Sequence, residues 1–325
     1  MRTAKLVDPR LLEILRCPES GQPLYVESDQ LVSSDGTRRY SVVDGIPCMM
    51  PEAALPTHQG YRDLLQENGT EDSFVEMSET EAIKFVLAML VATCGNLFRG
   101  AKLDRLVPIP DVPPELPDGR ILDVGCNWGR WSMAAAKAGR QVIGIDIHLK
   151  SLVAAKRISR QLAPDNEPLF VLGDGRYLPF SPMAFDGVFS YSVIQHFSKA
   201  NAAIILSEIR RVIKKQARSV IQMPNRAGIK SRLNLLRRGY SEGVEFDVRY
   251  HSIVELLQLF GSKIGKSEFF ADCFFGLNVH ASDRQFISTG KQWIVDLSIL
   301  ALQASRRFPS LGKYSDSVFI VSTKG

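Results

Sequence analysis

The alternation of strand-like and helix-like segments after residue 118 most constrains what this chain can fold into. Apolar segments typical of strands lie at 120–126, 141–147, 168–173, 185–193 and 218–223. Helical segments lie between them at 129–139, 149–163 and 199–213. Strands separated by helices of this length form right-handed βαβ units with a parallel sheet. With a helix from Ser252 to Gly261 and strands near 267–275 and 315–323, the sequence predicts a doubly wound, seven-stranded Rossmann-like α/β domain over 119–325.

Two further regions precede this domain. Residues 1–52 contain short alternating segments broken by Asp-Gly turns, which indicates a small β-rich module. Residues 53–118 are predicted to hold a helical segment and a Pro-rich linker; the helical part is 60–106, in which Ser78 and Glu81 make a capping-box pattern and Gly95 fits a helix stop. Five prolines between Pro108 and Pro117 then indicate an extended linker, because proline fixes φ and removes a backbone donor.

The cysteines and the apolar runs indicate a cytoplasmic protein. The five cysteines are scattered and form no CxxC pair, which argues against a disulfide framework and against a zinc site. The N-terminus has no uninterrupted apolar run of the kind found in signal peptides. The longest apolar runs, Ala82–Ala92 and Trp293–Ala304, are shorter than the roughly 20 residues that span a bilayer, and both are predicted to be core helices.

The first strand–helix turn, ILDVGCNWGRW, is the expected ligand site, because ligands bind beyond the carboxyl ends of parallel strands. Gly125 lets the backbone turn sharply and approach a ligand, and Gly129 lets the following helix pack closely on the strand. The N-terminus of that helix presents free N–H groups to a carboxylate or a phosphate. Taken alone, this turn is compatible with a dinucleotide, a mononucleotide or no ligand.

Two acidic residues narrow this choice. Asn127 stands where a dinucleotide-binding G-x-G-x-x-G turn has its middle glycine, and Asp123 beside the turn would repel a pyrophosphate. A carboxylate at that position can instead hold the ammonium group of an amino acid. Asp146 ends the next strand, at about the 20-residue spacing at which an acidic residue binds ribose hydroxyls. A pocket for an amino acid together with a ribose indicates S-adenosylmethionine.

From about residue 115 to 275 the chain resembles the class I S-adenosylmethionine-dependent methyltransferases of ubiquinone and menaquinone biosynthesis. The matching segments are LDVGCNWG, GIDI, GDGRYLPFSPMAFDGVFS and EIRRVIKK. The resemblance implies a methyltransferase sheet whose glycine turn, with Cys126, cradles the methionine part, while Asp146 and the adjoining Ile147 hold the ribose. It also implies that Asp174 contacts the adenine amino group.

The same resemblance implies that the backbone of Gly175 and Arg176 brackets the base and that Ser190 lines the pocket floor. Singly, Asp123 and Asp174 are also compatible with structural roles at a strand end or a loop, and it is the ordered set that indicates the cofactor. Asn127 and Trp128 replace the family's usual small residues in the turn, which bears on how the methionine tail is gripped. The family's Lys-Pro-Gly-Gly after the post-core helix is KKQAR here, and we expect this to alter only a surface turn.

The N-terminal segment LLEILRCPESGQPLYV and the following LVSSDGTRRYSVVDGIPCMMP resemble the small zinc-ribbon-type domain that activates tRNA and translation-factor methyltransferases. That family holds zinc with Cys-Pro-x-Cys and a second cysteine pair. Only Cys17 matches here, and Ser20, Ser33 and Ser34 occupy the region of its partners. The prediction is a module without metal that has a structural or substrate-capping role.

Methyl transfer from a sulfonium is an in-line displacement, for which the protein mainly aligns the reacting atoms. The segment SYSVIQHFSK after the fourth strand places Gln195 and His196 near the methyl end of the cofactor. His196 is the candidate general base for a hydroxyl acceptor. The alternative is a structural role, in which its side chain forms a hydrogen bond with a loop or caps the helix at 199–213. Motifs of nucleobase, glutamine and pyrimidine C5 methylation are absent. We therefore predict a small-molecule or lipid- or glycan-linked acceptor that is methylated on oxygen.

The net charge of +5 comes from one basic stretch, since ten Lys or Arg and no acidic residue lie between Arg210 and Arg238. The second half of this stretch belongs to 225–250, which is predicted to be a basic, lid-like insertion with Ile229, Leu233 and Leu236 on one helix face. Arg237 and Arg238 would then contact an anionic acceptor or one carried at a membrane surface. The alternatives are a solvated surface helix, an RNA-associated protein and a non-catalytic scaffold. A nucleic-acid partner is not expected, because no aromatic residue for base stacking lies within the stretch.

Overall fold

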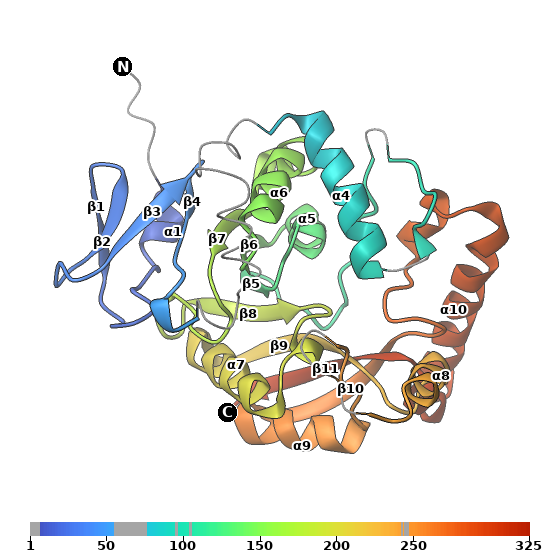
Figure 1. Ribbon diagram of the computed structural model, residues 1–325. Coiled ribbons are helices and arrows are strands. Elements are labelled where there is room, and N and C mark those ends of the chain that lie inside the picture. Colours follow the sequence, from blue (N-terminus) through green and yellow to red (C-terminus); the bar gives the residue numbers. More distant parts are fainter. Residues whose placement is uncertain (1–6, 55–76, 95–96, 104–105, 242, 244–246) are drawn as a thin grey trace.

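The computed structural model describes residues 7–54, 77–94, 97–103, 106–241, 243 and 247–325 (Figure 1). A seven-stranded sheet of order β10-β11-β9-β8-β5-β6-β7 forms its centre. The strands are β5 Arg120–Val124, β6 Gln141–Asp146, β7 Leu169–Leu172, β8 Phe185–Ser190, β9 Ile213–Pro224, β10 Gly265–Cys273 and β11 Ser317–Lys324. Strands β5 to β9 pair in parallel, and β11 runs antiparallel to both β9 and β10. The predicted doubly wound α/β sheet is therefore confirmed.

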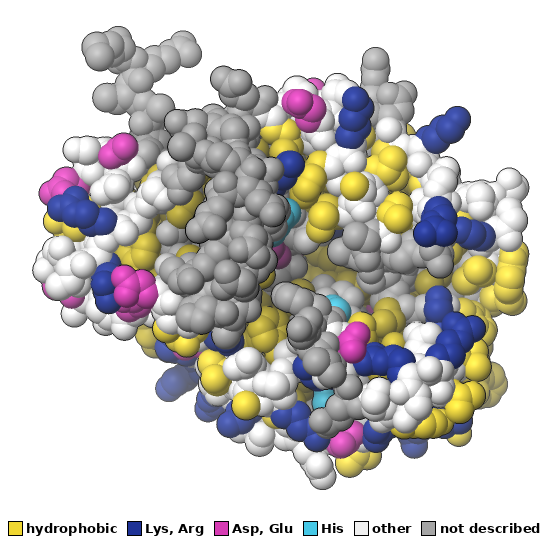
Figure 2. All heavy atoms as spheres, viewed as in Figure 1, with side chains coloured by type: hydrophobic (Ala, Val, Ile, Leu, Met, Phe, Trp, Pro, Cys, Tyr) yellow, Lys and Arg dark blue, Asp and Glu magenta, His cyan; other side chains and the backbone are white. Residues whose placement is uncertain are grey.

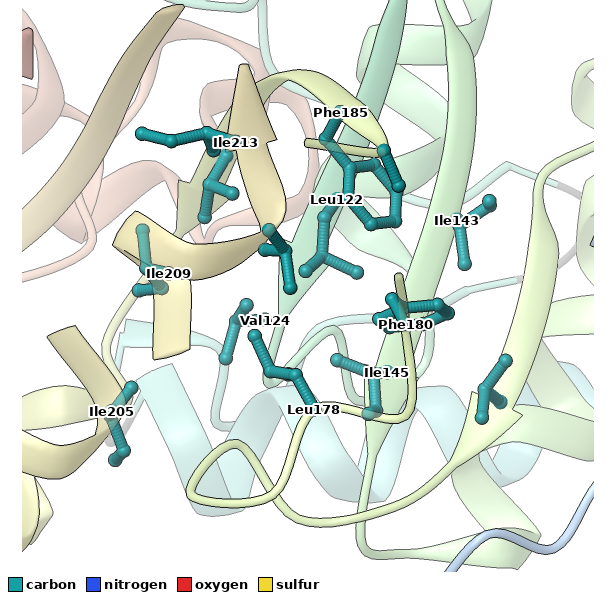
Figure 3. Close-up of a cluster of buried hydrophobic side chains, with 14 of the residues drawn as sticks. Leu122, Val124, Ile143, Ile145, Leu178, Phe180, Phe185, Ile205, Ile209 and Ile213 are labelled. Atoms are coloured by element: carbon teal, nitrogen blue, oxygen red, sulfur yellow. The ribbon is translucent and has the colours of Figure 1, made fainter. Parts of the chain in front are cut away.

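Side chains on successive residues of the strands pack on opposite faces of the sheet. Ile121, Val220 and Phe319 lie in one buried cluster with the alanines of α5 (Arg130–Lys137). Their neighbours Leu122, Ile221 and Ile320 lie in another, with α7 (Lys199–Val212) and α9 (Ile253–Lys263). Figure 3 shows part of this second cluster, where β5 and β6 side chains face isoleucines of α7. This alternation is what a sheet covered by helices on both faces requires.

The helices α4 (Glu79–Cys94) and α6 (Leu149–Leu162) lie side by side above the sheet (Figure 1). The predicted capping box of α4 is present, with Ser78 N donating to Glu81 Oε2 at 2.7 Å and Glu81 N to Ser78 Oγ at 3.3 Å. The predicted stop at Gly95 lies outside the described residues. Residues 106–117 have no regular structure, as expected of a proline-rich linker, but Leu116 is buried against the sheet. The linker is therefore part of the folded domain surface.

Strand β9 begins earlier than predicted, at Ile213 and directly after α7. Residues 214–217, which were expected to form a surface turn, belong to the strand because Ile213 and Ala217 are buried on either side of three exposed residues. Gln216 adopts a left-handed φ of 62° near a shift in the pairing of β8 with β9. The segment is thus an irregular strand start, and its one unusual torsion falls where the resembling family has glycine.

The N-terminal module contains α1 (Pro9–Leu12) and an antiparallel sheet of β1 (Leu24–Glu27), β2 (Gln30–Ser33), β3 (Arg39–Val43) and β4 (Ile46–Pro47). It lies against the edge of the central sheet at β7 (Figure 1). Met49 N donates to Leu172 O at 2.7 Å, and Arg16 N donates to Pro179 O at 2.9 Å. Leu11, Leu15 and Met49 share the hydrophobic cluster that contains Leu122. The module and the central sheet therefore share one hydrophobic core.

The remaining elements lie at the other end of the sheet: α8 (Ile229–Arg237), α10 (Thr289–Arg307) and the short 3-10 helices η5 (Ala281–Phe286) and η6 (Pro309–Tyr314). Two further 3-10 helices are η3 (Pro164–Asn166) and η4 (Ile194–His196). The expectation that 293–304 is a core helix is wrong, because Trp293, Leu297 and Leu300 are exposed. Within the described residues, no helix has both the length and the apolarity to cross a membrane.

Candidate functional site

A cavity of about 370 Å³ opens at the carboxyl ends of the parallel strands. Asp123 of β5, Asp146 at the end of β6 and Asp174 just after β7 all line it. Its other walls come from the glycine turn, the loop after β8, α4 and the loop after β10. The sheet edge predicted from the sequence is therefore where the structure places the cavity.

The glycine turn is held by its neighbours in a tight, left-handed conformation. Gly125 and Gly129 have φ of 74° and 77°, and Asn127 has φ of 49°. A Cβ at Gly125 would come within 2.3 Å of the Val193 side chain, and one at Gly129 within 3.1 Å of Ala155 in α6. Gly129 thus lets α5 pack closely, as predicted. No side chain caps the N-terminus of α5, which leaves its first N–H groups beside the turn.

Asp146 fixes the shape of the turn as well as facing the cavity. Its two carboxylate oxygens accept hydrogen bonds from the backbone N–H groups of Asn127 and His148, each at 2.9 Å. A carboxylate oxygen can accept more than one hydrogen bond. The same residue can therefore accept hydrogen bonds from ribose hydroxyls while it orders the turn.

Asp123 is buried, and Ser132 Oγ donates to its Oδ2 at 2.7 Å. Burial, with a smaller contribution from the nearby Asp146, raises the pKa of this carboxyl to about 7. A carboxyl group whose charge is disfavoured by burial gains most from a cationic partner. This geometry fits the ammonium group that the sequence assigned to it.

Asp174 is buried beside the cavity and forms an ion pair with Arg176, whose Nη2 lies 2.5 Å from Asp174 Oδ2. Asp174 and Gly175 line the cavity, whereas Arg176 does not. The side chain of Arg176 therefore holds Asp174 in place, and the sequence did not indicate this structural role. Cys126 and Ile147 also line the cavity, next to the turn and to Asp146.

Two predicted residues lie behind the cavity wall. The buried Ser190 Oγ donates to Val124 O at 2.8 Å and does not line the cavity. Gln195 is also buried; its Nε2 donates to Ser192 Oγ at 3.0 Å, and its Oε1 finds no partner among the described residues.

His196 does line the cavity, at the end of η4, and its carbonyl accepts a hydrogen bond from Arg249. His148 lines the cavity as well.

The predicted acceptor contacts Arg237 and Arg238 lie away from this cavity. Neither residue lines it, and Arg238 Nη2 forms an ion pair with Asp247 Oδ2 at 2.9 Å. The predicted helix is present as α8, with Ile229, Leu233 and Leu236 on one face, but that face is exposed to solvent. The structure therefore does not bring the basic helix over the cavity as a lid.

An aromatic wall was missed by the sequence interpretation. Trp131 of α5 stacks on Tyr191, with ring centroids 4.6 Å apart, and both line the cavity. Tyr191 directly follows β8, a position that could have suggested it. Its hydroxyl donates to Asp272 Oδ2 at 2.6 Å and lies 3.0 Å from His280 Nε2. Burial raises the pKa of Asp272 to about 6 and lowers that of His280.

These contacts fix the orientation of Tyr191, because its hydroxyl has partners on three sides, Leu277 O included. Asn278 from the same loop completes the cavity lining, and Leu90 of α4 faces it from the opposite side. Both residues are distant in sequence from the glycine turn, and no local pattern marks them. Across the described parts of the chain, no group of three His, Cys, Asp or Glu side chains could hold a metal ion.

In the N-terminal module, Cys17 is buried and its Sγ lies 3.1 Å from Tyr40 Oη. Ser20 N lies 3.4 Å from the same sulfur and donates to it. Burial by itself raises the pKa of Cys17, but the hydrogen bonds from Ser20 and Tyr40 bring it below its ordinary value. The single matching cysteine is thus occupied by protein partners.

Residues 121–216 match the family described as "Methyltransferase domain", and residues 8–45 match the family of Trm112p-like proteins. A demethylmenaquinone methyltransferase of Renibacterium salmoninarum is 29% identical over 150 residues, which are 46% of this chain and 58% of that protein. A UPF0434 protein of Bradyrhizobium sp. is 46% identical over 55 residues, which are 16% of this chain and 85% of that protein.

The chain therefore spans less than two thirds of the length of the methyltransferase relative and most of the length of the small one. Among solved structures, an SAM-dependent methyltransferase of Methanosarcina mazei aligns with 66% of this chain and 98% of its own, at 19% identity and a TM-score of 0.47.

Proposed function

This chain belongs to the Trm112p-like UPF0434 family through its N-terminal module and carries a methyltransferase domain behind it, and we propose that it transfers a methyl group from S-adenosylmethionine to an apolar small molecule. One observation carries the proposal. Three carboxylates at the ends of three adjacent strands, Asp123, Asp146 and Asp174, line a single cavity around a left-handed glycine turn.

The residues of the cavity fit this cofactor part by part. The buried carboxyl of Asp123 lines the cavity and would pair with an amino acid's ammonium group, and the uncapped N-terminus of α5 would bind its carboxylate. Asp146 would accept from the ribose hydroxyls, and Asp174 with Gly175 would hold the adenine. The cavity volume of about 370 Å³ lies within the range of small-molecule sites.

The bound cofactor would supply a methyl group already activated on a sulfonium, so the chain's own contribution is mainly alignment and exclusion of water. Trp131 and Tyr191 present a stacked aromatic wall, and Leu90 and Phe197 add apolar surface. These side chains favour a flat, apolar acceptor. His196 lines the same cavity and would accept the proton of a hydroxyl acceptor, which supports transfer to oxygen.

The menaquinone-pathway relative, by its name, acts on a demethylated quinone. An isoprenoid quinol or a similar lipid-linked ring has the flat, apolar shape that the aromatic wall favours, and we propose this acceptor class for the present chain. A nucleic-acid acceptor is less well supported, because the cavity lining is largely apolar and the basic α8 does not reach it.

Titration calorimetry with S-adenosylhomocysteine tests the cofactor site. Asp146→Ala should weaken binding by roughly 1.5–3 kcal/mol for each charge-assisted hydrogen bond that is lost. Asp165→Ala, at an exposed residue of η3 that does not line the cavity, is the matched control and should bind as the unchanged protein does. A folded Asp146→Ala protein with an unchanged dissociation constant would contradict the site.

Transfer of labelled methyl groups from S-adenosylmethionine to short-chain quinols then tests the acceptor. The proposal expects a product whose formation slows in His196→Gln without a change in cofactor affinity. If a panel of quinols, phenols and catechols gives no product while the cofactor binds, the acceptor class is wrong and the cofactor site stands.

A further inference from the structure

The apolar side of α8 faces solvent. Ile229, Leu233 and Leu236 are 50–62% exposed, and their spacing of four and three residues places them on one face of the helix. Leu235 is the one apolar side chain of α8 that is buried. An amphipathic helix in a globular protein normally turns its apolar face to the core. Helix α8 does the opposite.

Helix α10 has the same property. Trp293, Leu297 and Leu300 follow the same spacing and are 43–60% exposed. The next segment continues the pattern, since Phe308, Leu311 and Tyr314 around η6 are also exposed. Apolar side chains of this size that are exposed in groups mark an interaction surface, whereas single ones need no explanation.

Hydrogen bonds tie these elements to one end of the sheet. Asp316, the residue before β11, accepts from Ser231 N of α8 at 2.8 Å and from Phe275 N at 2.7 Å. Ser298 of α10 accepts from Phe274 N at 3.1 Å. Helix α10 thus bonds Phe274 directly, and α8 is linked to the next residue, Phe275, through Asp316. Figure 1 shows both helices at the same end of the molecule.

The charges of this region are almost all positive. Residues 226–241 contain no acidic residue and five Lys or Arg, of which Arg238 forms an ion pair with Asp247. Residues 289–314 contain four Lys or Arg and one acidic residue, Asp296. Asp296 forms an ion pair with Arg284 at 2.8 Å. Figure 2 shows Lys and Arg side chains next to hydrophobic ones on the side of the molecule that carries α8 and α10.

We propose that the α8–α10 face, formed by the exposed apolar residues of α8, α10 and η6 and the cations around them, docks on an anionic phospholipid membrane. Trp and Tyr side chains prefer the interfacial region of a bilayer, and Lys and Arg are attracted to anionic headgroups. Helices with exposed apolar side chains flanked by cations lie in the plane of such an interface.

The positive charge and the apolar side chains of the α8–α10 face argue against two other partners, a second copy of the chain and a nucleic acid. A second copy of the chain would bring two basic faces together, and like charges across an interface are unfavourable. A nucleic acid would use the cations but would leave the exposed Leu and Ile side chains without an apolar partner. The loop 274–280 links the face to the cavity, since Phe275 contacts Asp316 while Asn278 lines the cavity. The proposal itself does not rest on methyl transfer.

Sedimentation with vesicles tests the face without any enzymatic readout. The full chain should bind vesicles of equimolar phosphatidylserine and phosphatidylcholine, bind pure phosphatidylcholine vesicles much more weakly, and be released by high salt. Leu233→Ser with Leu236→Ser, and separately Arg232→Gln with Arg237→Gln, should each lower the vesicle partition coefficient by about tenfold or more. All four side chains are exposed, so these variants should keep the fold.

The matched controls are Val254→Ser on α9 and Lys84→Gln on α4, both exposed and away from the face, and they should bind as the unchanged protein does. Trp293 supplies a second readout, because the other two tryptophans, Trp128 and Trp131, are buried. Vesicles should shift the emission to the blue, and Trp293→Phe should abolish that shift.

Three results would overturn the proposal: equal binding to both kinds of vesicle, no loss in the paired variants, or no binding at all. If the unchanged protein is a dimer and the Leu233→Ser, Leu236→Ser variant is a monomer, the face is a self-association surface instead. Salt-sensitive binding of RNA that the arginine variant loses, without vesicle binding, would assign it to nucleic acid.

Discussion

The carboxyl group of Asp123 has almost no access to solvent, and we expect this to make the stability of the protein depend on pH. Its pKa of about 7 in the folded state lies above its ordinary value of 3.8. Between these values the unfolded chain is ionised while the folded protein keeps the proton. The folding free energy therefore becomes less favourable as pH rises from about 4 to about 7, by at most roughly 1.4 kcal/mol per pH unit, and is constant above.

Asp123→Asn should remove this dependence and leave the variant more stable than the unchanged protein at neutral pH. Urea unfolding across this pH range measures the difference, with the highly exposed Asp118→Asn as control. If the free energy of unfolding changes with pH in the same way for Asp123→Asn and for the unchanged protein, the carboxyl group of Asp123 is ionised in the folded state.

The affinity of the unchanged protein for S-adenosylhomocysteine should rise with pH up to about 7, because the ammonium group of the ligand needs the ionised carboxylate of Asp123.

Among single residues, Asp123 and Asp146 were predicted because the ends of adjacent parallel strands meet at one edge of the sheet, whereas Asp174 was implied by the resemblance to the quinone-biosynthesis methyltransferases. It did not predict the aromatic wall, because Trp131 and Tyr191 meet only once α5 is packed on β8. Ser190 was expected to line the cavity, but its hydroxyl bonds Val124 O instead. Ser190 is the last residue of β8, and the sequence does not show whether its hydroxyl turns to the cavity or bonds a neighbouring backbone carbonyl.

Among the elements, the start of β9 contains a local strain that can be relieved. Gln216 has a φ of 62°, a region that disfavours residues with a Cβ by roughly 1–2 kcal/mol. Gln216→Gly should raise the free energy of unfolding by up to about 1 kcal/mol. The exposed neighbour Lys215 does not have a positive φ, so Lys215→Gly should lower it by about 0.5–1 kcal/mol. Thermal unfolding of both variants compares them, and an equal loss of stability would contradict the assigned torsion.

The helices and strands themselves were predictable to within a few residues, since apolar periodicity sets them. Whether the apolar face of a helix is buried or exposed could not be predicted. The spacing of Ile229, Leu233 and Leu236 predicted a common helix face, and that of α10 an apolar helix, yet both faces are exposed. Periodicity defines which side chains share a face, while the covering of that face depends on chain segments far away in sequence.

For the molecule as a whole, the N-terminal module is expected to fold without zinc, and this stays a prediction. Cys17 is the one cysteine that matches the zinc-holding family, and its sulfur contacts Tyr40 and Ser20. Elemental analysis of the purified chain should find no stoichiometric zinc, and prolonged chelation should leave its melting temperature unchanged. Zinc at one equivalent that resists mild chelation would show that other residues supply the missing ligands.

The pairing of Met49 with Leu172 has a consequence for how the protein behaves on dilution. Two separate chains that meet through such a strand edge come apart as their concentration falls, whereas two parts of one chain keep the same effective concentration of each other. Module and sheet are therefore always present in equal amounts. The assembled state persists at whatever level the cell expresses the chain.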